Sequence, residues 1–101
     1  MSQFGSQEKT LAPLKGALVS AAAATTVALG PVAAYRVKRL ESSAGTLKWA
    51  SQEGTADASN GYTLTATDPD SGWIPGDGDY SLALYASGGA VDYEIMRTRR
   101  G

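Results

Sequence analysis

Hydrophobic and polar residues alternate most regularly over residues 77–97. Apolar side chains occupy every second position over residues 80–86, and again over residues 91–95. A period of two is typical of β-strands with one buried face. The pair Gly88-Gly89 separates the two runs and can adopt the positive φ values of a two-residue hairpin turn. We therefore predict a β-hairpin with one dry face, in which Ala86 pairs with Val91, Leu84 with Tyr93 and Leu82 with Ile95.

Shorter alternating runs predict further strands upstream. Residues 34–41 and 46–51 each alternate, with a turn at 42–45, so we expect them to form a second hairpin. Arg39 followed by Leu40 breaks the alternation of the first run, and a β-bulge near Arg39 would restore it. Residues 62–67 alternate apolar side chains with threonines and predict one more strand.

The alanine-rich run at residues 17–34 admits three interpretations. With Lys9 and Lys15 before it as the charged region, it has the apolar and small-residue regions of a signal peptide. Alanines favour a helix, which Thr25, Thr26 and Val27 oppose and Pro31 would end. It can also form two short strands, at about 18–22 and 25–29, with Gly30-Pro31 as the turn that follows, and we favour this third interpretation. The run is too short and too polar to cross a bilayer, so no membrane association is expected.

About seven short strands with frequent turns predict an all-β fold, a small antiparallel β-sandwich or jelly roll. Residues 1–16 are polar and lack periodicity, with three isolated apolar residues. They predict an extended N-terminal arm that gains structure against a partner. Residues 17–101 would form the sandwich domain with a short basic C-terminal tail. The candidate docking residues of the arm are Phe4, Leu11 and Leu14.

The composition excludes much catalytic and metal chemistry. The 101 residues include no cysteine and no histidine, which excludes disulfides, zinc sites built on these residues and any imidazole base. Asp92 and Glu94 share one face of a strand, but a domain this small offers them no deep cleft, and no nucleophile has an evident base. We expect no enzyme, no catalytic residue and no cofactor.

A net charge of −1 hides a segregation along the sequence. Positive charges exceed negative ones up to Lys48, every charge over residues 49–96 is negative, and the tail is basic again. The ends of the chain can therefore attract its middle, within one molecule or between copies, unless these are ordinary solvated charges. The tail is too short, and too poor in aromatic residues, to predict nucleic-acid binding. Its candidate partner-binding residues are Arg97, Arg99 and Arg100.

The connection at residues 68–79 is rich in aspartate, glycine and proline. Its carboxylates could converge on calcium, but Gly72 and Trp73 stand where the helical calcium loop needs a ligand and a glycine. Local hydrogen bonds to the backbone are the simpler interpretation, and no metal ligand is predicted. Trp73 is a candidate interface anchor or sugar platform, or else a lid on the open end of the sandwich. Tyr85, on the outer face of the last predicted hairpin, is the other candidate partner-binding residue of the sandwich domain.

The order of these features, with the segments ATTVALGPVAAYRV and GDGDYSLALYASGGAVDYEI, resembles small virion proteins of tailed bacteriophages. The similarity is closest to head decoration, or cement, proteins, and covers residues 17–96 as a pattern of strands and turns. The resemblance implies a β-domain added to the outside of a capsid, with arms that bridge neighbouring shell subunits. It also implies a location in the virion, the major capsid protein or another virion protein as partner, and a homo-oligomer, often a trimer.

Two functions of different classes therefore follow from the sequence. The first is a non-enzymatic virion structural protein that decorates and stabilises a phage capsid, with an arm that docks on a neighbour. The second is a carbohydrate-binding or adhesin-like β-sandwich of a tail or fibre, in which Trp73, Tyr85 and the acidic loop bind a sugar with or without calcium.

Overall fold

The computed structural model describes residues 8–51 and 54–100, and these residues form an all-β fold without a helix. The prediction of an all-β class is confirmed. Within the described residues no helix is long and apolar enough to cross a membrane. The strands are β1 (Glu8–Thr10), β2 (Leu14–Leu18), β3 (Thr25–Arg39), β4 (Thr46–Ser51), β5 (Tyr62–Leu64), β6 (Ile74–Ser87) and β7 (Val91–Arg100).

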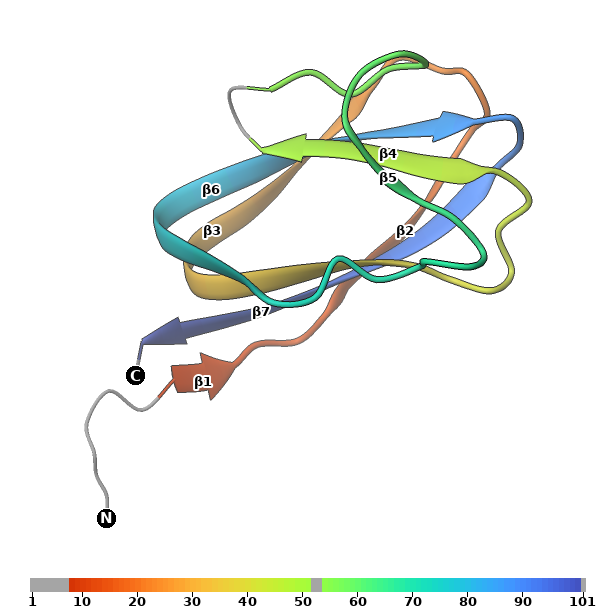
Figure 1. Cartoon of the computed structure of the whole chain (residues 1–101). Coiled ribbons are helices and arrows are strands. Elements are labelled where there is room, and N and C mark those ends of the chain that lie inside the picture. The colour runs from red at the N-terminus through yellow and green to blue at the C-terminus, as the bar shows by residue number, and fades with distance from the viewer. Residues whose placement is uncertain (1–7, 52–53, 101) are drawn as a thin grey trace.

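All seven strands belong to one antiparallel sheet, in the order β1-β7-β3-β6-β4-β5, with β2 also paired to β7. The long strand β3 joins the two halves of this sheet, because it pairs with β6 over Thr25 to Tyr35 and with β7 over Ala34 to Arg39. The sheet folds over, so that its halves face each other (Figure 1). This arrangement is compatible with the predicted small β-sandwich.

Two short backbone links join the chain after β2 and the chain after β5 to inner strands of the sheet. After β2, Ser20 forms a bridge with Ala86 of β6, and the Ala21 N–H donates to the Ala86 carbonyl at 2.8 Å. After β5, the chain returns to β3, where Lys38 bridges Asp70. The chain that follows each of these outer strands is therefore hydrogen-bonded to an inner strand, which satisfies some of its backbone groups.

The predicted alternation correctly identifies the core. Leu82, Leu84, Val91 and Ile95 are fully buried, and Ala83, Asp92 and Glu94, which alternate with the buried positions, are half-buried on the outer face. They pack with fully buried side chains from β3 and β4, among them Leu29, Val37 and Leu47.

The predicted pairing of this segment as a hairpin is wrong. β3 lies between β6 and β7, so Leu84 pairs with Thr25, and Tyr93 pairs with Arg39. Gly88 and Gly89 do adopt positive φ, at 76° and 150°, but the turn carries the chain from one half of the sheet to the other. Alternation reveals which face of each strand is dry; it does not reveal whether two dry faces lie side by side or meet across a core.

The second predicted hairpin is also wrong, because β4 pairs with β5 and β6 and does not pair with β3. No bulge occurs near Arg39 either: burial continues at every second residue from Tyr35 through Val37 to Arg39. Arg39 itself points inward and is 8% exposed. Its Nε donates to the Gly45 carbonyl at 2.7 Å and its Nη2 to the Ser43 carbonyl at 3.0 Å. Carbonyl oxygens of the following turn thus solvate a charge that the predicted bulge would have turned outward.

The alanine-rich run forms strands at both ends, but their limits differ from those predicted. β2 ends at Leu18, and β3 runs from Thr25 straight through Gly30-Pro31, the expected turn. Gly30 has φ 70°, and the pairing with β6 shifts register between Ala28 and Gly30. A bulge therefore accommodates the glycine, and the proline lies exposed within a strand whose pairing is already irregular.

Residues 8–18 lie along the outer edge of β7. β1 pairs with Thr98 to Arg100, and β2 pairs with Val91 to Ile95. Of the three docking residues predicted for the arm, Leu11 and Leu14 are half-buried, and Leu14 packs against the core; Phe4 lies outside the described residues. The division of the chain at residue 16 stays a prediction.

Candidate partner-binding site

The residues predicted to bind partners lie in three separate places. Trp73 is 46% exposed and immediately precedes β6, whereas Tyr85 is half-buried near the other end of that strand. Arg97 and the exposed Arg99 lie on β7, in the part that pairs with β3 and β1. Arg97 is engaged with its own fold, because its Nη1 donates to the Leu29 carbonyl at 2.7 Å. Arg100 ends β7.

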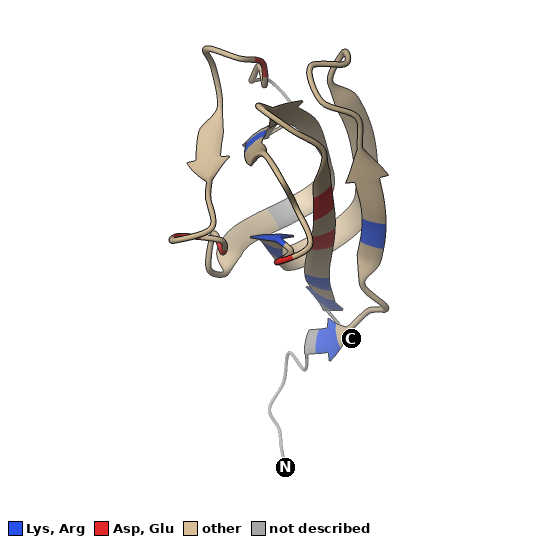
Figure 2. Ribbon diagram, turned by 90° about the vertical axis from the view of Figure 1, so that its right-hand side faces the viewer, with Lys and Arg blue, Asp and Glu red and all other residues tan. Residues whose placement is uncertain are grey.

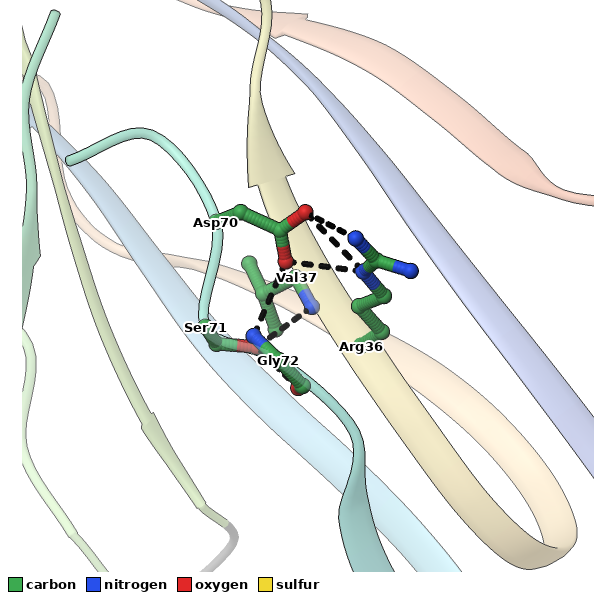
Figure 3. A network of polar contacts seen from close by, with 5 residues as sticks. All are labelled: Arg36, Val37, Asp70, Ser71 and Gly72. Carbon is green, nitrogen blue, oxygen red and sulfur yellow. Dashed lines mark hydrogen bonds and ion pairs between the residues drawn. The ribbon is translucent and has the colours of Figure 1, made fainter. Parts of the chain in front are cut away.

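Trp73 lies next to a polar network of Arg36, Asp70 and Ser71, which Figure 3 shows, and contacts its Arg36. Arg36 points out from β3, and its Nε donates to both carboxylate oxygens of Asp70, at 2.8 and 2.9 Å. Its Nη2 also donates to Asp70 Oδ2. A carboxylate held by several N–H donors fixes the plane of the guanidinium.

The backbone around Asp70 is held as firmly as its side chain. The Ser71 N–H donates to the Val37 carbonyl at 2.9 Å, and the Ser71 hydroxyl accepts from the Val37 N–H at 2.9 Å. The Gly72 N–H donates to Asp70 Oδ1 at 2.8 Å (Figure 3). These hydrogen bonds join the loop before β6 to β3, and they fix the position of Trp73, which follows Gly72.

The Arg36 guanidinium carbon lies 5.9 Å from the centre of the Trp73 ring, within the range of a cation–π contact. We call Arg36, Asp70 and Trp73 the Trp73 patch. It combines an exposed indole with an arginine that is already ordered, and these two residue types dominate binding energy at protein interfaces. Met96 of β7 lies directly opposite Arg36 in the sheet register and extends this outer surface.

Electrostatics favour the charged forms of both partners. The hydrogen bonds from Arg36 come first in holding the pKa of Asp70 below its ordinary value, followed by the Gly72 N–H and by the positive charges of Arg36 and Lys38; partial burial opposes them. The same hydrogen bond with Asp70 raises the pKa of Arg36. The pair therefore stays ionised at neutral pH.

We expect Asp70→Asn to lower the free energy of unfolding by about 1 kcal/mol at pH 7. Because the folded-state pKa of Asp70 is depressed, its stabilising contribution is complete above the ordinary value of 3.8 and is lost as pH falls through the lower folded value. The difference between wild type and variant should therefore shrink as the pH is lowered below 3.8. Urea unfolding between pH 7 and pH 2 measures it. A difference that stays constant would contradict this role for Asp70.

Among the acidic side chains that the structure describes, no group of three or more is arranged to hold an ion. Asp70 is already engaged by Arg36 and Gly72. The interpretation of acidic turn residues as local hydrogen-bond acceptors fits Asp70 and also Asp57, which accepts from the Ser59 and Asn60 N–H groups at 2.8 Å each.

The charge segregation of the sequence survives in part. Basic residues gather at the pole where β1 and the end of β7 lie, beyond the acidic residues of β7 (Figure 2). One attraction between an end of the chain and its middle is direct: Lys15 Nζ lies 3.6 Å from Glu94 Oε2. This contact is exposed on the lysine side, so it adds little to stability.

A comparison with family models, with curated proteins and with solved structures finds no match to this chain. The site is therefore interpreted from its geometry. Sequence reasoning found Trp73 and the acidic loop but missed Arg36, which it treated as an ordinary outward residue. Arg36 and Asp70 lie 34 positions apart, and only the return of the chain to β3 brings them together.

Proposed function

We propose that the protein is a non-enzymatic virion structural protein that decorates and stabilises a phage capsid by bridging neighbouring shell subunits. The observation that carries the proposal is the Trp73 patch. There an exposed indole is held in place by the ion pair of Arg36 with Asp70 and by a loop that is hydrogen-bonded to β3. A large side chain that is ordered before binding loses little entropy in an interface. The patch is therefore suited to a rigid protein surface.

The backbone links within the sheet also fit this function. The chain after β2 is joined to β6 at Ser20, and the chain after β5 is joined to β3 at Asp70, so the domain is suited to bridge two shell subunits as a rigid unit. The sequence segments that resemble decoration proteins form β3, β6 and β7, the strands that build the core. The major capsid protein, or another virion protein, is the partner that we propose, and a homo-oligomer is the proposed form.

We expect Trp73→Ala to weaken attachment to particles by about 30-fold, the effect of a central interface residue. The measurement is co-sedimentation of the purified protein with capsids assembled from the major capsid protein of its source, over a range of protein concentrations. Val19→Ala is the matched control, because Val19 is an exposed apolar residue, at 74%, outside the patch.

Wild-type protein that fails to sediment with the capsids would refute the proposed function. Equal binding of wild type and Trp73→Ala would keep attachment but refute the Trp73 patch as its site. Thermal unfolding of each variant shows that a loss of binding reflects the surface rather than the fold.

A further inference from the structure

A concave surface adjoins the Trp73 patch, at the place where β4, β5 and the start of β6 meet β3, and Asp70 lines both. It is a cleft of about 640 Å³, within the range of small-molecule sites. Four aromatic residues line it, one from each of these strands: Tyr35, Trp49, Tyr62 and Tyr80. We call it the aromatic cleft. Neither Trp73 nor Tyr85 lines it.

The aromatic rings pack against one another in a graded way, from buried to exposed. Tyr35 and Trp49, each 3% exposed, meet edge to face at 6.1 Å between ring centres. Tyr62 lies over Trp49 at 4.8 Å and is 65% exposed. Tyr80 contacts Tyr35 at 5.9 Å. The cleft therefore has a fixed aromatic floor and, in Tyr62 on the short strand β5, one exposed ring at its edge.

One residue that lines the cleft, Trp49, carries a polar group without a partner. The indole Nε1–H of Trp49 is buried and donates to no acceptor in the described residues. A buried donor left unpaired costs about 1–3 kcal/mol, so such groups in folded proteins call for an explanation. An oxygen atom delivered by a ligand would remove this cost.

The rim and walls of the cleft add further hydrogen-bonding groups. Ser51 and Thr63 contribute hydroxyls, and the exposed Asp68 contributes a carboxylate. The Tyr35 hydroxyl stays protonated, because burial, together with the neighbouring Tyr80 and Tyr62, raises its pKa. The ligand must therefore offer oxygens that accept, hydroxyls that donate to a carboxylate, and an apolar face for an aromatic ring.

From these requirements we infer that the aromatic cleft binds a neutral hexopyranose unit of a glycan. A sugar ring has hydroxyls around its edge and an apolar C–H face, so one molecule meets all three demands. A quaternary ammonium would suit the rings but offers no acceptor to the Trp49 N–H. A proline-rich peptide offers carbonyl acceptors but few donors for Asp68.

Binding requires a small movement, because Nε1 of Trp49 is covered in the free protein. Tyr62 is the exposed ring that packs on this indole, and it lies on a three-residue strand at the end of the sheet order. The Tyr62 ring swings aside, the sugar oxygen reaches Nε1, and the ring then packs on the C–H face of the sugar. The site is thus completed by the ligand.

The test is titration of the full chain with cellotetraose, maltotetraose, chitotetraose and mannotetraose, followed by tryptophan fluorescence and saturation-transfer NMR. We expect saturable binding of at least one of these sugars. Trp49→Phe keeps a ring but removes the N–H, and Tyr62→Ala removes the exposed ring; each should weaken binding by about 3- to 10-fold. Tyr62→Phe should bind nearly as well as wild type, and Val19→Ala serves as the control.

Trp49 belongs to the core, so thermal unfolding checks the fold of Trp49→Phe, and the exposed Tyr62 provides an independent result. The inference is overturned if none of the four sugars binds at millimolar concentration, or if tetramethylammonium or a proline-rich peptide binds in their place. It is also overturned if both variants bind sugar as wild type does. Trp49 and Tyr62 lie outside the Trp73 patch, so these outcomes leave the capsid attachment that we propose for that patch to its own test; Asp70, which lines both surfaces, is left unchanged.

Discussion

Gly45→Ala is expected to lower the free energy of unfolding by about 3 kcal/mol, as a side chain forced into closely packed backbone does. Gly45 is buried at the start of β4, against the turn that connects β6 to β7. A Cβ there would lie 2.7 Å from the Ser87 carbonyl oxygen and still closer to the Gly89 carbonyl oxygen. These are backbone atoms, so no side chain can rotate away to make room.

The turn cannot shift cheaply either. The Ala44 and Gly45 N–H groups both donate to the Ala90 carbonyl, at 2.8 and 3.0 Å, so moving the two segments apart breaks hydrogen bonds. For a domain of this size the loss corresponds to a decrease in Tm of roughly 12–24 °C. Circular dichroism during heating, together with urea unfolding, measures both quantities.

Gly76→Ala is the control for this prediction. Its Cβ would meet side-chain atoms only, the nearest being Cγ2 of Val32 at 3.1 Å, and side chains can adjust. We expect a change of less than about 1 kcal/mol for this control. Equal stability of the two variants would show that the contact between Gly45 and the Gly89 turn is not a tight one.

Arg39→Leu is expected to cost about 2–4 kcal/mol. The guanidinium donates to the carbonyls of Gly45 and Ser43, and leucine leaves both acceptors without their donor at a buried corner. Replacing both partners of a buried polar pair with apolar groups can be harmless, but here the backbone carbonyls remain. Arg39→Lys restores one donor and should recover part of the loss.

Lys38→Leu serves as the control for Arg39, because it removes a neighbouring positive charge whose side chain faces the outer side of β3. We expect a change within about 0.5 kcal/mol. Urea unfolding at pH 7 compares the three variants. If Arg39→Leu is as stable as wild type, the turn carbonyls find other donors, and Arg39 does not hold this corner.

The corner around Arg39 also shows where the sequence predicts well and where it fails. The alternation of apolar residues correctly identified Leu82, Leu84, Val91 and Ile95 as core, because burial of one strand face depends on local spacing. The prediction failed at Arg39, where the alternation argued for the core but the charge argued for the surface and for a bulge. The carbonyls that make burial possible belong to the following turn.

Strand neighbours were predicted least well. The Gly88-Gly89 pair has the positive φ values expected of a hairpin turn, yet β3 separates the two strands it connects. Pairing depends on which distant segment fills an edge, and no local pattern records this. The same limit applies to both sites. Arg36 meets Asp70, and Trp49 meets Tyr62, only through long-range topology.

The position of β7 in the sheet has a consequence for synthesis. β7 follows every other described strand in the sequence, yet it is the partner of β1, β2 and the second half of β3. While residues 91–100 are still inside the ribosome, β1, β2 and the second half of β3 have unpaired backbone groups and uncovered apolar side chains. The native sheet therefore cannot assemble strand by strand as the chain emerges. Completion of the sheet must wait for β7, and pairings between segments so distant in sequence slow folding.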